Sequence, residues 1–111
     1  METKHTPGPW VIDWNVSRLD IFGSDGTTLV ASLRRSSLSQ AIDEAARSNA
    51  RLIAAAPELY DALRELLTDM VIAQGNMRKA AKRDPAWEGC AEIIQPRIDA
   101  ARAAIAKAEG K

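Results

Sequence analysis

The sequence contains a single cysteine, Cys90, and a single histidine, His5. One cysteine excludes an internal disulfide and is typical of a protein from a reducing compartment. A structural zinc site takes about four ligands, mostly Cys and His, and a nucleophilic triad built on histidine would have only His5 available. We therefore expect no metal site, no cofactor and no catalytic residues, so that the protein is not an enzyme.

An excess of charge of one sign and long apolar runs are also missing. The 15 basic and 15 acidic side chains cancel, so no overall field attracts the chain to nucleic acid or to a membrane surface. The longest apolar run, residues 52–56, is far shorter than the roughly 20 residues that span a bilayer. The opening METKHTPGPW lacks the apolar segment of a signal peptide. We expect a cytoplasmic protein with neither a membrane nor a nucleic acid partner.

The composition changes near residue 36. Most glycine and aromatic residues precede this point, and nearly all alanines follow it. Strand-formers and turn-formers therefore come first, and helix-formers come second. The length of 111 residues suits one domain. We expect a single α+β domain over residues 1–111, with a β meander in 1–36 and a helical part in 37–111.

Three short stretches of the first part alternate apolar and polar residues, which is the period of a half-buried strand. They centre on Ile12, on residues 19–21 and on residues 29–33. Residues 15–17 and 23–26 separate them as turns, the second because Asp-Gly tolerates a positive φ. The pattern predicts a three-stranded antiparallel meander with one apolar face, which needs a covering layer.

The helical part begins with Ser37 and Gln40, spaced as a capping box for a helix over residues 38–55. Asn49 lies on the predicted apolar stripe of this helix. The other stripe residues are Leu38, Ile42, Ala45, Leu52 and Ala56. The amide of Asn49 would then either contact a ligand or bond to a partner helix.

A second helix is expected from Pro57, and a third from Pro85 with Asp84 as its N-cap. Each carries a heptad seam, the second at Leu59, Leu63, Leu66, Met70, Ala73 and Met77, and the third at Trp87, Ala91, Ile94, Ile98, Ala101 and Ile105. Matched seams joined by a short loop predict a long antiparallel helical hairpin. Cys90, beside the third seam, is expected to be a small buried side chain.

The arms of this hairpin would be roughly 35 Å long, whereas the strands of the meander span about 20 Å. Part of the hairpin must therefore project beyond the meander. Projecting seams are commonly covered by another copy of the same chain. We expect a homo-oligomer, a dimer or higher.

The candidate ligand site lies where the meander meets the first predicted helix. It comprises Arg34, Arg35, Arg47, Asn49, Arg51, Trp10 and Trp14. Arginine side chains bind phosphate through paired hydrogen bonds, and tryptophan rings stack on bases. The alternative is that these arginines form ion pairs with Asp13, Asp43 and Glu44 on a solvated surface.

A second basic cluster falls at the predicted tip of the hairpin. Its members are Arg78, Lys79, Lys82 and Arg83. These cations either steer an acidic partner to the tip, or stabilise the end of the second helix by about 0.3–1 kcal/mol. The sequence assigns no functional role to His5 or Cys90.

Two short segments of the sequence resemble segments of known proteins. His5–Trp10 reads HTPGPW, and Asn49–Leu59 reads NARLIAAAPEL. They resemble a widespread group of small bacteriophage and prophage proteins, in which the first phrase opens a short β region and the second opens the helical half.

The resemblance implies a phage accessory function, and small phage proteins without catalytic residues commonly act by binding. We therefore expect a phage-encoded binding protein that works in the host cytoplasm and counteracts bacterial immunity. The favoured hypothesis is sequestration of a small nucleotide ligand that serves as an immune signal. The alternative is a protein-interaction module whose helical hairpin inhibits or adapts a host defence protein.

Overall fold

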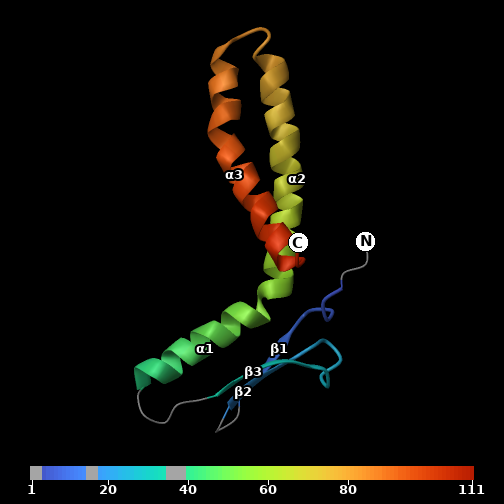
Figure 1. The fold of residues 1–111 in the computed structure, drawn as a ribbon, viewed down its shortest axis with the longest axis vertical. Coiled ribbons are helices and arrows are strands. Elements are labelled where there is room, and N and C mark those ends of the chain that lie inside the picture. Colours follow the sequence, from blue (N-terminus) through green and yellow to red (C-terminus); the bar gives the residue numbers. More distant parts are fainter. Residues whose placement is uncertain (1–3, 15–17, 35–39) are drawn as a thin grey trace. The chain divides into compact units, whose positions relative to one another are not determined.

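The computed structural model describes residues 4–14, 18–34 and 40–111, which form two compact units over residues 1–59 and 60–111 (Figure 1). Three antiparallel strands precede three helices, so the expected α+β fold is confirmed. The expected turn at residues 15–17 and the expected cap at Ser37 lie outside the described residues.

The first unit consists of a sheet covered by one helix. Its elements are β1 (Val11–Trp14), β2 (Arg18–Phe22), β3 (Leu29–Arg34) and α1 (Gln40–Ala54). The strand order is β1-β2-β3 with both pairs antiparallel, as the alternating pattern predicts. The core between the sheet and α1 contains Leu19, Ile21 and Ala50, each with 0% exposure.

Helix α1 packs on the sheet through small side chains. Ala50 forms a buried cluster with Leu19 and Ile21 of β2, and Ala46 and Ile53 pack against this cluster. In contrast, Asn49 is exposed and Leu52 is 63% exposed. The predicted stripe is therefore wrong by one residue, or about 100° of helix rotation. The small side chains of Ala46 and Ala50 allow the helix backbone to approach the sheet closely.

The turn between β2 and β3 is organised by one carboxylate. Asp25 Oδ1 accepts the backbone N–H groups of Thr27 and Thr28 at 3.0 and 2.9 Å, and Gly26 has a φ of 74°. This confirms the Asp-Gly turn. Hydrogen bonds from the hydroxyl and backbone N–H of Thr28 lower the pKa of Asp25 to about 2.

The second unit is the helical hairpin of α2 (Ala56–Ala80), whose first residues belong to the first unit, and α3 (Ala86–Ala108). Asp84 Oδ1 accepts the backbone N–H of Ala86 at 3.1 Å. The N-cap position of α3 is nevertheless Pro85, so the helix begins one residue later than predicted. At the other end of the hairpin, the Tyr60 hydroxyl donates to Glu109 Oε2 at 2.6 Å. This bond raises the pKa of Tyr60 and lowers that of Glu109.

The predicted seam of α3 faces α2 over most of its length. Ala91 and Ile98 are buried, and Ile94, Ala101 and Ile105 are half-buried. Two expectations of burial at the start of α3 are wrong. Trp87, in the first turn, is 44% exposed, and Cys90 is exposed. Trp87 lies at the start of α3, close to where α2 ends, so α2 offers it little surface to pack against. Cys90 directly precedes Ala91 and therefore points about 100° away from the seam.

The seam of α2 is displaced from its prediction. Leu63, Met70, Ala73 and Met77 are half-buried as expected, but Leu59 and Leu66 are 53% and 58% exposed. Their places are taken by half-buried Tyr60 and Leu67, and Gln74 is the most buried described residue of the hairpin part of this helix. A spacing of alternately three and four residues fits two lines along α2, one through Leu59 and Leu66 and one through Tyr60 and Leu67. Both lines contain Leu63, Met70 and Met77, so the heptad spacing alone did not distinguish them.

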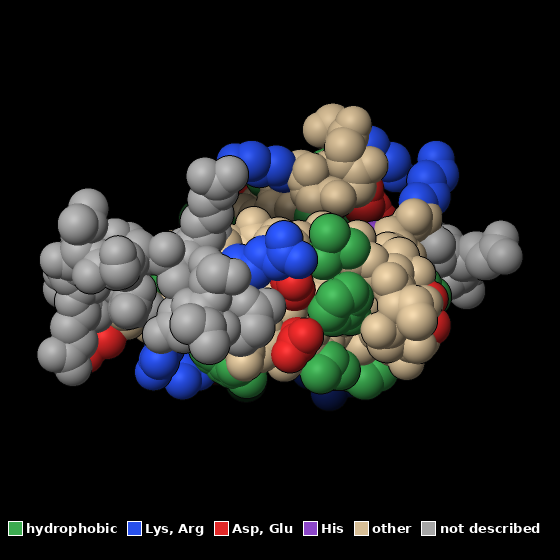
Figure 2. Space-filling view, turned by 90° about the horizontal axis from the view of Figure 1, so that it is seen from below, with side chains coloured by type: hydrophobic (Ala, Val, Ile, Leu, Met, Phe, Trp, Pro, Cys, Tyr) green, Lys and Arg blue, Asp and Glu red, His purple; other side chains and the backbone are tan. Residues whose placement is uncertain are grey.

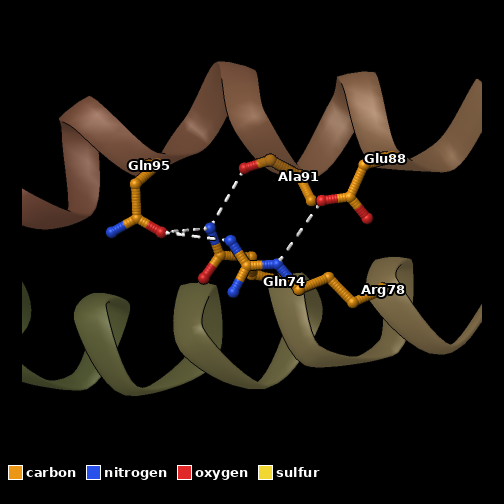
Figure 3. Close-up of polar contacts among 5 residues, drawn as sticks. All are labelled: Gln74, Arg78, Glu88, Ala91 and Gln95. Atoms are coloured by element: carbon orange, nitrogen blue, oxygen red, sulfur yellow. Dashed lines mark hydrogen bonds and ion pairs between the residues drawn. The ribbon is translucent and has the colours of Figure 1, made fainter. Parts of the chain in front are cut away.

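Gln74 joins the two helices in the half of the hairpin that is nearer its tip (Figure 3). Its Nε2 donates to the backbone oxygen of Ala91 at 3.0 Å and to Gln95 Oε1 at 2.8 Å. Arg78 on the same side of α2 lies 3.5 Å from Gln95 Oε1 and 3.9 Å from Glu88 Oε1. A buried amide that is bonded in only one alignment sets the register of the two helices.

Substitution of Gln74 should therefore destabilise the hairpin. Gln74→Ala leaves the Ala91 carbonyl and Gln95 without this partner, and we expect a loss of about 1–3 kcal/mol in chemical denaturation. Asn76→Ala, an exposed position on the same helix, is the control and should change the stability little. Equal losses in both variants would contradict a role for the Gln74 bonds.

The turn at Asp25 should respond to acid. Because the folded pKa of about 2 lies below the usual 3.8, the carboxylate stabilises the turn fully above pH 3.8, and this is lost as the pH falls through about 2. In an NMR titration, the Thr28 amide signal should follow this midpoint. Asp25→Asn should abolish the titration, and a midpoint near 3.8 in the unsubstituted protein would contradict the bonds.

Candidate functional site

The structure brings two residues of the predicted ligand site together at the edge of the first unit. Trp14 is the last residue of β1 and pairs with Leu19, so both side chains lie on the sheet face that α1 covers. Arg51 Cζ on α1 lies 5.4 Å from the centroid of the Trp14 ring. Such a cation–π contact is worth about 0.5–1 kcal/mol at an exposed site, and Trp14 remains 48% exposed.

Arg47 lies one helical turn before Arg51, about 40° away around α1, and both side chains are exposed. Among the described side chains, no ion pair joins either arginine to Asp13 or Glu44. The Asp43 side chain lies outside that description. Two guanidinium groups and an exposed indole therefore share one side of the first unit.

The other predicted site residues do not join this pair. Trp10 is half-buried against the core, and its Nε1 donates to the Thr6 carbonyl at 2.9 Å, so its ring serves the packing of the unit. Asn49 is about 160° away from Arg51 around α1, on its opposite side. The Cα of Arg34 pairs with that of Arg18 at the end of β3. The Arg34 side chain and the whole of Arg35 lie outside the described residues.

The chain carries no net charge, and Figure 2 shows how charged side chains are distributed on one face of the molecule. Acidic and basic side chains lie among hydrophobic ones on the coloured part of this view, with no broad patch of one sign. An anion would therefore be held by nearby guanidinium groups rather than by a field of the whole molecule. Among the described residues, no three His, Cys, Asp or Glu side chains gather to hold a metal ion.

The phrases HTPGPW and NARLIAAAPEL meet in the first unit. A Cβ atom on Gly8 would lie 2.8 Å from Cβ of Pro57, and one on Gly23 would lie 2.6 Å from Cγ2 of Thr6. The Pro7 carbonyl also accepts the backbone N–H of Ser24 at 3.4 Å. Sequence reasoning missed these contacts, because a Pro-Gly-Pro run indicates irregular backbone but not the surface that it packs against.

At the hairpin tip, the structure separates the four predicted cations. Arg78 contacts Gln95 and Glu88 between the helices, whereas Lys79, Lys82 and Arg83 are exposed. Trp87, also exposed, begins α3 just after this loop. The tip therefore presents three cations and one indole to solvent.

The fold and the candidate site define a small α+β protein with an arginine–tryptophan edge and a helical hairpin. Residues 1–111, the whole chain, match the model of the family described as Salmonella phage P22 protein Y8K6. The chain belongs to this phage protein family. No curated protein and no solved structure matches the chain.

Membership of a phage protein family is consistent with the resemblance of HTPGPW and NARLIAAAPEL to bacteriophage and prophage proteins. None of the described helices has the length and hydropathy needed to cross a membrane.

The contact of Gly8 with Pro57 should make position 8 intolerant of a side chain. Gly8→Ala places a methyl group within 2.8 Å of Pro57, and overpacking of this kind costs about 1–3 kcal/mol. Gly75→Ala is the matched control, because nothing lies within 4 Å of its Cβ position and alanine in a helix gains about 0.5–1 kcal/mol. Thermal melts of the two variants should shift in opposite directions, and a stabilised Gly8→Ala variant would contradict the contact.

Proposed function

We propose that this phage protein is a non-enzymatic binding protein that counteracts bacterial immunity by sequestering a nucleotide-type immune signal in the host cytoplasm. The observation that supports this proposal best is the pair formed by Trp14 and Arg51 at the exposed edge of the first unit. Membership of a phage protein family sets the biological context.

The chemistry of the pair suits a ligand that has both a base and a phosphate. The Trp14 indole is 48% exposed, and stacking of a base on such a ring contributes about 1–3 kcal/mol. Arg51 and Arg47 follow one another on the same side of α1 and present their guanidinium groups to solvent. Guanidinium forks bind phosphate oxygens through paired hydrogen bonds.

The location of the pair on a strand and a helix favours binding. Trp14 belongs to a paired strand, and Arg51 follows Ala50, which is fully buried against that sheet. Side chains held on regular elements lose less freedom on binding than side chains on loops. The ligand would therefore meet a preformed pair.

A second candidate function rests on the hairpin tip. Trp87 is 44% exposed and follows the exposed cations Lys82 and Arg83. Tryptophan and arginine are enriched among residues that dominate protein interfaces. In this alternative, the tip contacts an acidic surface of a host defence protein and inhibits or adapts it.

Arg51→Ala should distinguish the two candidates. Loss of a charged hydrogen bond of about 1.5–3 kcal/mol should weaken binding of a cyclic dinucleotide or a cyclic ADP-ribose isomer about ten- to a hundredfold, measured by calorimetry. The helix should persist, because alanine is the best helix former. Arg51→Lys should weaken binding less, since it keeps the charge and loses the fork.

The control variants are Arg102→Ala, an exposed arginine on α3, and the double variant Lys79→Ala with Lys82→Ala. Both should bind the nucleotide as the unsubstituted protein does. Absence of any binding across the nucleotide panel would refute the sequestration proposal. Loss of anti-defence activity in infected cells from the tip variant, with none from Arg51→Ala, would favour the hairpin-tip alternative.

A further inference from the structure

The hairpin buries little of its own apolar surface. In its described residues, Ala91 and Ile98 are the only buried apolar side chains, whereas Leu66, Ile72 and Ile93 are 58%, 59% and 65% exposed. Helices in water gain most of their stability from burial of an amphipathic face. Small units with a thin core are commonly completed by oligomerisation.

Two of these exposed residues lie on the same broad side of the hairpin. Leu66 is about 80° around α2 from Gln74, which faces α3, and Ile93 is about 140° around α3 from Ile98, which faces α2. Because the two helices are antiparallel, these rotations turn both side chains to one side. We call this side the open face; it comprises the exposed residues Leu66, Asp69, Ile93, Arg97 and Ala104 and the half-buried Ala73.

Ile72 does not belong to the open face. It is about 160° around α2 from Gln74 and therefore points away from α3. Its exposed fraction of 59% is nearly that of Leu66, 58%. Ile72 is thus a matched control for Leu66: it lies on the same helix and has a side chain of similar size and exposure, but it points in another direction.

The interhelical bonds place the residues of the open face at matching heights. Gln74 lies level with Ala91 and Gln95, and Tyr60 lies level with Glu109. At a rise of about 1.5 Å per residue, Leu66 is then at the height of the alanines around residue 102. By the same count, Asp69 is near the height of Arg97, and Ala73 near that of Ile93.

We propose that a second copy of the chain covers the open face and completes a four-helix bundle. In this dimer a two-fold axis runs parallel to the hairpins, so α2 of each copy packs antiparallel against α3 of the other. Leu66 then faces Ala104 of the second copy, and Ile93 faces Ala73. A large side chain meets a small one at both places, as close packing requires.

The charges of the open face favour the same arrangement. Asp69 of one copy comes opposite Arg97 of the other, and the two-fold axis repeats this pair. The alternative two-fold axis, across the hairpins, would place Asp69 against Asp69 and Arg97 against Arg97. Like charges in contact oppose such a complex, so charge complementarity selects a second copy in one orientation.

The test is the oligomeric state of the full chain, measured by native mass spectrometry and light scattering over a dilution series. We expect a dimer whose melting temperature rises with concentration. Leu66→Glu and Ile93→Glu should yield monomers that keep helical circular dichroism, whereas Ile72→Glu should remain a dimer. A monomeric unsubstituted protein, or equal dissociation by Ile72→Glu and Leu66→Glu, would overturn the proposal.

Charge reversal tests the orientation. Asp69→Arg and Arg97→Asp should each weaken the dimer by about tenfold or more, and the double variant should restore it, because every pair again joins opposite charges. No recovery in the double variant would overturn the assigned pairing. These measurements do not involve the nucleotide site, so their failure leaves the Trp14–Arg51 proposal to its own test.

Discussion

The close approach of α1 to the sheet is the constraint on which the first unit depends. Ala50 is fully buried with Leu19 and Ile21, and a larger side chain at that point would hold the helix away from β2. Burial of Ala50 also determines the direction in which the Arg51 side chain leaves α1. Arg51 is turned about 100° from the core, which brings its guanidinium over Trp14 at the edge of β1. The packing of a small residue thus positions the candidate ligand site.

The hairpin depends on a different kind of contact. Its register is set by the buried amide of Gln74, bonded to Ala91 and Gln95 across the helices, since apolar seams alone permit several alignments. The same register sets the heights of Leu66, Asp69 and their counterparts on α3. The geometry of the proposed dimer would therefore depend on this polar contact inside the hairpin. Dimer formation would also bury apolar side chains that two helices alone leave exposed.

Strand alternation, turn chemistry and proline positions predicted the elements well, because each is a local property of the chain. The candidate site was predicted less well from such local properties. Trp14 and Arg51 were in the predicted set, but so were Trp10, whose indole the core and the Thr6 carbonyl occupy, and Asn49, which lies on the other side of α1. An alanine-rich helix has several possible apolar stripes, and only the surface that it packs against selects one.

Local residue patterns were enough to predict the order of three strands and three helices and the turn at Asp25. These follow from backbone preferences and residue chemistry over a few neighbouring positions. Tertiary structure alone decided the rotation of α1, the burial of Gln74 and the meeting of Gly8 with Pro57. Each joins residues distant in sequence, and each depends on steric fit and on hydrogen bonds that exist only after the elements have packed.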